Sequence, residues 1–174
     1  MNRFLSRLRE TWLPLVIIAV AVVLDIITKQ LAVAFLKPIG TLPIIKDVFH
    51  LTYRTNTGAA WSLFSAPNPR WIFMSISTVA ILAMLVYLFA VKTNSRLMKI
   101  GLGAIIGGGI GNMIDRISLG YVVDFLDARI INFPVFNVAD CFVTVGAGIL
   151  MLALILDWKD EAKGGTREDN AADN

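Results

Sequence analysis

The chain has 174 residues, of which 56% are hydrophobic and only 17% are charged, and its mean hydropathy is +0.69. A soluble domain usually carries about a quarter charged residues, so this composition favours a membrane protein over a soluble fold. The single cysteine, Cys141, and the single histidine, His50, exclude an internal disulfide and are too few for a zinc site of the usual cysteine and histidine type.

Four apolar runs are candidates for membrane-spanning helices, at residues 13–36, 71–91, 98–117 and 141–156. The first run follows a basic N-terminus and resembles a cleavable signal peptide, but Asp25 and Lys29 interrupt it. We therefore expect a retained first helix and a membrane α-helical fold, a bundle of four transmembrane helices. This bundle is predicted to form a single membrane domain over residues 1–157.

The distribution of lysine and arginine predicts the orientation of this bundle. Basic residues precede the first run, are frequent in the connection between the second and third runs, and follow the fourth run. The two longer connections contain fewer basic residues for their length. Both termini should therefore be cytoplasmic, and the connections 37–70 and 118–140 should face outward. Residues 158–174 are polar and lack apolar periodicity, so we expect a disordered cytoplasmic tail there.

The two outward connections differ in composition. Residues 41–64 are rich in β-branched and aromatic side chains and carry turn signals from Asn56 to Gly58, which predicts a small sheet or hairpin lying on the membrane surface. We expect His50, within this segment, at the surface or the interface. Gly120 and Pro134 break up the second connection, so a short extracytoplasmic helix or loop is predicted for it.

Polar residues inside the apolar runs need partners, because a charge near the middle of a span costs about 2.5 to 3.5 kcal/mol on insertion scales. Asp25 and Lys29 are four residues apart and so lie on one helix face, which favours an internal ion pair. Three glycines of the third run, Gly103, Gly107 and Gly111, recur at four-residue steps and predict the close approach of another helix.

A polar cluster ends the third run, where Asn112, Asp115 and Arg116 follow one another closely. We expect Asp115 and Arg116 to neutralise each other or to reach other polar groups. The cluster is interpreted as structural support rather than as the site of the chemistry.

Three aspartates lie within the second outward connection, residues 118–140. Asp140 begins the fourth run, where the helix N-terminus favours a carboxylate, and Asp127 beside Arg129 is typical of a solvated loop pair. Asp124 has apolar neighbours on both sides and no basic residue within four positions. Two close acids share one proton, and the ionised one can activate water for amide hydrolysis. Asp124 and Asp140 are therefore candidates for an aspartyl dyad that needs neither a metal nor another cofactor.

Five segments support this hypothesis through their order along the chain: "LDIITK", "RTNTGAAWS", "GNMIDR", "GYVVDF" and "FNVADC". Over residues 12–157 the chain resembles the bacterial lipoprotein signal peptidases (signal peptidase II), a family of four-span aspartyl peptidases. The resemblance implies that Asp124 and Asp140 are the catalytic pair. It also implies substrate-binding or supporting roles for Asn56, Gly58, Asn112, Arg116, Asn137, Asp25 and Lys29.

The same resemblance implies the substrate and the setting. The family cleaves prolipoproteins just before a cysteine that carries a diacylglyceryl group, at the outer face of the cytoplasmic membrane. The expected partners are therefore lipid-modified precursors and membrane lipids. Neither nucleic acid nor an obligate protein partner is expected.

Three alternative readings remain open. A small transporter or proton conductor would explain Asp25, Lys29 and the glycine-rich helix as parts of a permeation path, although the chain has no internal repeat. A serine–lysine peptidase would use Ser62 with Lys29, and a non-catalytic scaffold would leave Asp124 unexplained.

Overall fold

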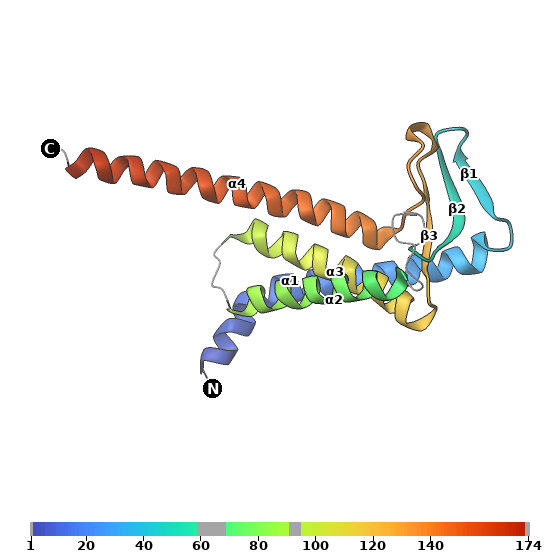
Figure 1. The fold of residues 1–174 in the computed structure, drawn as a ribbon, viewed down its shortest axis with the longest axis horizontal. Coiled ribbons are helices and arrows are strands. Elements are labelled where there is room, and N and C mark those ends of the chain that lie inside the picture. Colours follow the sequence, from blue (N-terminus) through green and yellow to red (C-terminus); the bar gives the residue numbers. More distant parts are fainter. Residues whose placement is uncertain (1, 59–68, 91–94, 173–174) are drawn as a thin grey trace.

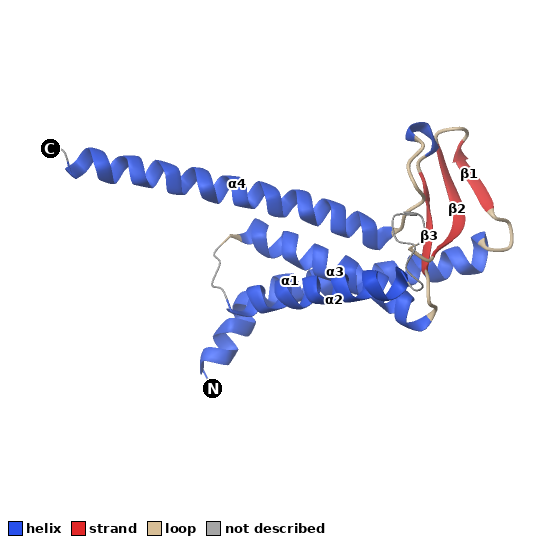
Figure 2. Ribbon diagram, viewed as in Figure 1, coloured by secondary structure: helices blue, strands red, loops and turns tan. Residues whose placement is uncertain are grey.

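A computed structural model describes residues 2–58, 69–90 and 95–172 of the chain. Four helices lie side by side, and a small sheet stands across one end of them, as Figures 1 and 2 show. The helices are α1 (Asn2–Leu31), which continues into the π-helix η1 (Ala32–Leu36), α2 (Pro69–Ala90), α3 (Arg96–Ser118) and α4 (Val138–Ala172). The remaining elements are the strands β1 (Thr41–Ile45), β2 (Phe49–Asn56) and β3 (Val122–Asp127) and the 3-10 helix η2 (Arg129–Ile131).

Within these described ranges, three helical stretches are long and apolar enough to cross a membrane: Trp12–Leu36, Arg96–Ser118 and Val138–Lys159. Helix α2 contains a shorter apolar stretch, Met74–Ala90. Large apolar side chains of α1, such as Val16, Val20 and Ile27, are about half exposed, as expected for surfaces that face lipid rather than water. The chain is a multi-pass membrane protein with a predominantly helical fold.

Helix α3 lies at the centre, in contact with α1, α2 and α4. Its glycines allow this, because a Cβ atom built at Gly107 would lie 2.7 Å from the Cβ of Ala21 on α1. On another face, a Cβ at Gly101 would lie 2.8 Å from the backbone nitrogen of Leu150 on α4. The close helix approach predicted from the glycine spacing is confirmed.

The sheet is antiparallel with the order β1-β2-β3, and its strands come from two distant parts of the chain. The predicted hairpin is confirmed for β1 and β2, which are joined by a turn at Asp47 (φ 60°), while residues 59–64 of the same segment lie outside the described residues. The second outward connection contains more than the predicted helix or loop. It supplies β3 and η2. The strand was not predicted, because β3 pairs with β2, which lies far away in the sequence.

Two further expectations differ from the structure. His50 is only 5% exposed, and neither of its ring nitrogens has a hydrogen-bond partner among the described residues, so it is not a surface residue. Helix α4 continues through Ala172 rather than ending before a disordered tail. The residues that extend it include several good helix formers, among them alanine, glutamate, lysine and arginine.

Candidate active site

Strand β3 places Asp124 by simple alternation. Val123 and Phe125 pack against Ala32 and Leu36 of η1 in a small apolar cluster. Successive side chains of a strand point to opposite faces, so Asp124 points away from this cluster. It is only 2% exposed. The apolar neighbours that make Asp124 conspicuous in the sequence are therefore the side chains that anchor its strand.

The start of α4 places Asp140. The fully buried Asn137 precedes this helix, and its Oδ1 accepts a hydrogen bond from the Asp140 N–H at 2.9 Å. Asp140 Oδ2 in turn accepts from the Asn137 N–H at 3.1 Å. This reciprocal pair is a capping box, which satisfies free N–H groups at the helix start. Asn137 is therefore the N-cap, and Asp140 is the acidic residue in the first turn, as the helix start predicted. The same geometry fixes the direction of the Asp140 carboxylate.

Asn137 also joins the two aspartates. Its Nδ2 donates to Asp124 Oδ1 at 2.7 Å and to Asn112 Oδ1 at 3.0 Å. Asn112 Nδ2 donates to Asp140 Oδ1 at 2.8 Å. Two amides therefore hold both carboxyl groups in one hydrogen-bonded network, and this brings together residues from β3, α3 and the start of α4.

Lys29 of α1 also binds to this network. Its Nζ lies 2.7 Å from Asp25 Oδ2, 2.9 Å from Asn112 Oδ1 and 3.2 Å from an oxygen of Asp115. These three acceptors match the three N–H donors of an ammonium group. The predicted Asp25–Lys29 pair is therefore confirmed. Asp25 Oδ1 also accepts from the Ala139 N–H at 3.0 Å, which ties α1 to the start of α4.

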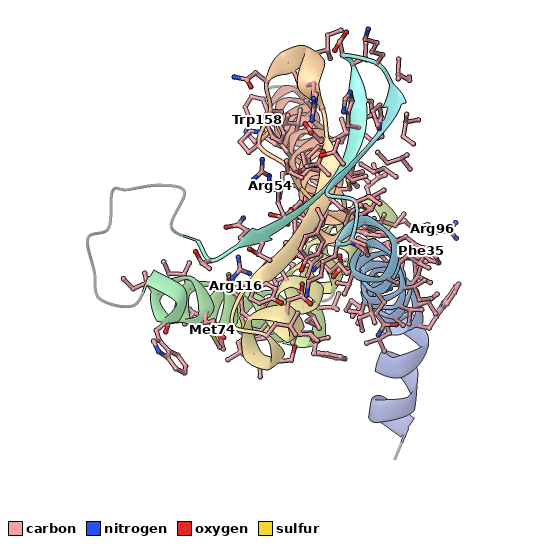
Figure 3. The ribbon with its side chains drawn as sticks, turned by 90° about the vertical axis from the view of Figure 1, so that its right-hand side faces the viewer. Phe35, Arg54, Met74, Arg96, Arg116 and Trp158 are labelled. Atoms are coloured by element: carbon pink, nitrogen blue, oxygen red, sulfur yellow. The ribbon has the colours of Figure 1, made fainter. Side chains whose placement is uncertain are left out.

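Of the two possibilities expected for Asp115 and Arg116, the structure shows the second, in which each side chain reaches other polar groups. Asp115 Oδ2 binds Lys29 and also accepts from the Val123 N–H at 3.0 Å, which anchors β3 next to Asp124. Arg116 donates through Nη1 to the Asn112 carbonyl at 3.3 Å. Its guanidinium, labelled in Figure 3, lies within electrostatic range of Asp124 and Asp140.

Asn56 reaches the site from the end of β2. In the sheet register Arg54 lies opposite Asp124, so Asn56 is its diagonal neighbour, and the Asn56 side chain hydrogen-bonds to the Asp124 carboxyl group. Asn56 Oδ1 also accepts from the Gly58 N–H at 2.9 Å. Gly58 has φ +81°, a left-handed conformation that glycine adopts without strain. This short turn holds the Asn56 amide in place.

Burial sets the protonation of Asp124. Desolvation and then the negative charge of Asp140 raise the pKa of Asp124 from 3.8 to about 6. Hydrogen bonds from Asn56 and Asn137 and the charge of Lys29 lower this pKa only in part. Asp124 is therefore protonated below about pH 6, and the charge of the neighbouring Asp140 contributes to this.

Asp127 is not the solvated loop residue that the sequence indicated. It is 8% exposed, and its Oδ2 accepts from Thr52 Oγ1 at 2.7 Å and from Arg129 Nε at 3.1 Å. Burial acts to raise the pKa of Asp127, but these two hydrogen bonds and the charge of Arg129 hold it below its usual value. The pairing with Arg129 is confirmed, and the carboxylate additionally joins β3 to β2.

A groove of about 530 Å³ opens beside the two aspartates. Asp140 lines it together with Asn56 and Thr144, and the buried Asp124 is hydrogen-bonded to the lining residue Asn56. Cys141 is half-buried and also lines the groove. The walls are otherwise apolar and are formed by Ala128, Ile131, Phe133, Pro134, Val135, Phe136 and Val145.

Other chemistries find less support at this site. Among the described residues, no three histidine, cysteine or acidic side chains are grouped as metal ligands. Lys29, the required base of a serine–lysine mechanism, is held by acidic and amide oxygens, and Ser62 lies outside the described residues.

Comparisons with known proteins identify the family. A sequence profile described as signal peptidase (SPase) II matches residues 17–156. The lipoprotein signal peptidase of Caldanaerobacter subterraneus subsp. tengcongensis is 45% identical over 154 residues, 88% of this chain and 99% of that protein. The lipoprotein signal peptidase of Brevibacillus brevis is 42% identical over 143 residues, covering 82% and 95%. A bacterial membrane enzyme solved by the in meso method is 30% identical with a TM-score of 0.73, covering 81% of this chain and 91% of that one. With this match over most of its length, the chain belongs to the signal peptidase II family.

Proposed function

We propose that Asp124 and Asp140 are the catalytic carboxylates of this aspartic peptidase, which removes the signal peptide from prolipoproteins. The observation that carries the assignment is the position of Asn137, which hydrogen-bonds to both carboxyl groups at once, at 2.7 Å and 3.1 Å. A single residue that holds two acids from different elements fixes the geometry that a dyad needs.

The two acids take different roles in this proposal. Asp124, with a pKa of about 6, donates a proton to the scissile carbonyl oxygen. Asp140 accepts N–H donors from Asn112 and Asn137, which stabilise a negative charge, and it removes a proton from the attacking water. The resulting tetrahedral intermediate collapses when Asp140 returns that proton to the leaving amine and Asp124 recovers its own from the hydroxyl.

The surroundings of the pair suit a lipid-bearing precursor. The groove combines polar groups at Asn56, Asp140 and Thr144 with walls that are otherwise apolar. An extended peptide can place its scissile amide against the polar groups, while the acyl chains of its modified cysteine remain in the bilayer. Arg116 and Asn56 then lie where backbone carbonyl oxygens of the substrate pass the dyad.

The fold and the charge pattern together support a membrane topology. Helices α1 and α3 begin, and α2 and α4 end, at one end of the bundle, and the sheet stands at the other end (Figure 1). Asp124 belongs to β3 of this sheet, and Asp140 lies in the first turn of α4. We propose that α2 is the fourth span, that the first end is cytoplasmic, and that the site faces the outer side of the bacterial cytoplasmic membrane. Residues 1–157 then form one membrane domain.

The proposal is tested by replacing each acid with its amide. Asp124→Asn and Asp140→Asn should each lower the rate of cleavage of a diacylglyceryl-modified precursor by at least about a hundredfold, because each removes one half of the acid–base pair. The matched control is Asp47→Asn, at an exposed turn residue whose left-handed conformation asparagine also adopts. Circular dichroism in the same detergent should find all three variants folded. If either Asp124→Asn or Asp140→Asn cleaved the precursor at the full rate, the assignment of these two residues as the catalytic pair would be wrong.

A further inference from the structure

The end of the sheet that carries the β1–β2 turn and η2 is unusually apolar for a surface. This end projects beyond the start of α4 in Figure 1, and the Ile130 N–H donates to the Val48 carbonyl at 3.2 Å, which joins η2 to the turn. Single exposed apolar residues are common, but a cluster of large ones marks an interaction surface. We call this cluster the apolar tip; its members, more than half exposed, are Ile44, Ile45, Ile130, Ile131 and Phe133.

The apolar tip is oriented toward the membrane-spanning part of α4. Ile131 and Phe133 line the active-site groove together with Thr144 and Val145. Thr144 and Val145 belong to the span Val138–Lys159, so the groove joins the tip to a lipid-facing helix. Apart from the polar groups at Asn56, Asp140 and Thr144, the groove wall is apolar, so apolar surface of the bundle continues onto the sheet.

The exposed charged side chains at the apolar tip are Lys46, Asp47 and Arg129, and Arg129 is paired with the buried Asp127. Lys46 is exposed in the β1–β2 turn, and the side chain of Arg129 is 43% exposed at the start of η2. Within residues 41–58 and 120–136 the only exposed acid is Asp47, because Asp124 and Asp127 are buried. Apolar side chains flanked by basic ones are the pattern of a segment that lies in the interface of an anionic membrane.

We propose that the apolar tip inserts into the interfacial layer of the outer leaflet and that Lys46 and Arg129 bind the phosphates of anionic phospholipids. This inference rests on the topology of the proposed function, which places the sheet on the outer side. Binding of anionic lipid would then keep the sheet at the membrane surface beside α4. The groove would stay open toward the bilayer, from which a lipid-anchored precursor arrives. A second copy of this chain is a poorer occupant, because a twofold contact places the same basic side chains near each other.

Photo-crosslinking in nanodiscs tests the proposal without any need for catalysis. The crosslinker p-benzoylphenylalanine replaces Ile130, and the discs contain phosphatidylglycerol and phosphatidylcholine in equal amounts. Mass spectrometry should find lipid adducts in which phosphatidylglycerol exceeds phosphatidylcholine by about fivefold, since one basic side chain near an anionic surface contributes about that factor. The same crosslinker in place of Leu152, an exposed residue of α4, is the positive control for lipid contact.

A charge reversal then identifies the residue responsible. Lys46→Glu should remove most of the phosphatidylglycerol preference at position 130, whereas Lys159→Glu, the same change at the other end of the span, should leave it intact. No lipid adduct at position 130 alongside clear adducts at position 152 would overturn the proposal. So would equal labelling of the two lipids, or an adduct to a second copy of the protein. Each of these outcomes is independent of the result for the aspartate variants.

Discussion

Replacing Asn137 with alanine removes a side chain that contacts both the Asp124 carboxyl group and the Asp140 N–H. Its effects on folding and on catalysis should be separable. In the folded protein this side chain accepts from the Asp140 N–H and donates to Asp124, Asn112 and the Val123 carbonyl. Asn137 is fully buried, so water cannot replace the lost contacts. Alanine keeps only the backbone half of the capping box, in which the Asn137 N–H donates to Asp140.

The size of the loss follows from these contacts. Loss of a helix N-cap costs about 0.5 to 2 kcal/mol. Loss of a hydrogen bond to a group that carries charge costs about 1.5 to 3 kcal/mol. Taken together, these two contributions lead us to expect that Asn137→Ala lowers the free energy of unfolding by about 2 to 5 kcal/mol. Misplacement of the carboxyl groups should lower kcat by about a hundredfold or more.

Asn137→Ser separates the two effects. A serine hydroxyl is a good N-cap but is shorter and cannot cap the helix and reach Asp124 together, so it should recover about 1 kcal/mol of stability. It should not recover turnover. Thermal unfolding in detergent and cleavage of a lipidated precursor measure the two quantities on the same samples. Turnover of Asn137→Ala within a few-fold of the unsubstituted enzyme would refute the reasoning.

Three further outcomes are expected. A Cβ at Gly111 would lie 2.5 Å from Asp25 Oδ2, so Gly111→Ala should displace the Asp25 side chain and sharply reduce the cleavage rate. The control is Gly148→Ala, which should leave the rate unchanged because nothing lies within 4 Å of a Cβ there. Asn56→Ala removes a hydrogen bond that lowers the pKa of Asp124, so the limb of the pH–rate profile that reports Asp124 should move to higher pH; a shift to lower pH would reverse our assignment. EDTA should not change the cleavage rate, because two carboxylates perform the proton transfers, and a loss would require a metal.

Features set by local spacing were predictable from the sequence. The pairing of Asp25 with Lys29 follows from their separation by one helical turn, and the close contact at Gly107 follows from the regular spacing of glycines. The capping role of Asp140 also follows from its place at the start of an apolar run. Each of these inferences needs only the geometry of a single helix.

Features that depend on contacts between distant segments were not predictable. Strand β3 was missed because "VVDFLD" shows little alternation, and its pairing of Asp124 with Arg54 joins residues far apart in the chain. The burial of His50 and Asp127 follows from the same pairing, since the two residues lie opposite each other in the sheet. The partners of Asp115 could not be named beyond polar groups in general, because no spacing rule indicates the Val123 N–H that it binds.

The proposed dyad requires that the negative charge of Asp140 acts on the carboxyl group of Asp124 and helps to raise its pKa. Carbon-13 NMR of labelled aspartate carboxyl groups measures this directly, with Asp124→Asn used to assign the signal. The account predicts that Asp124 titrates near pH 6 and that Asp140→Asn lowers its pKa, because the neighbouring negative charge is gone. An Asp124 carboxyl group that titrates near its ordinary value of 3.8, with or without Asp140, would contradict it.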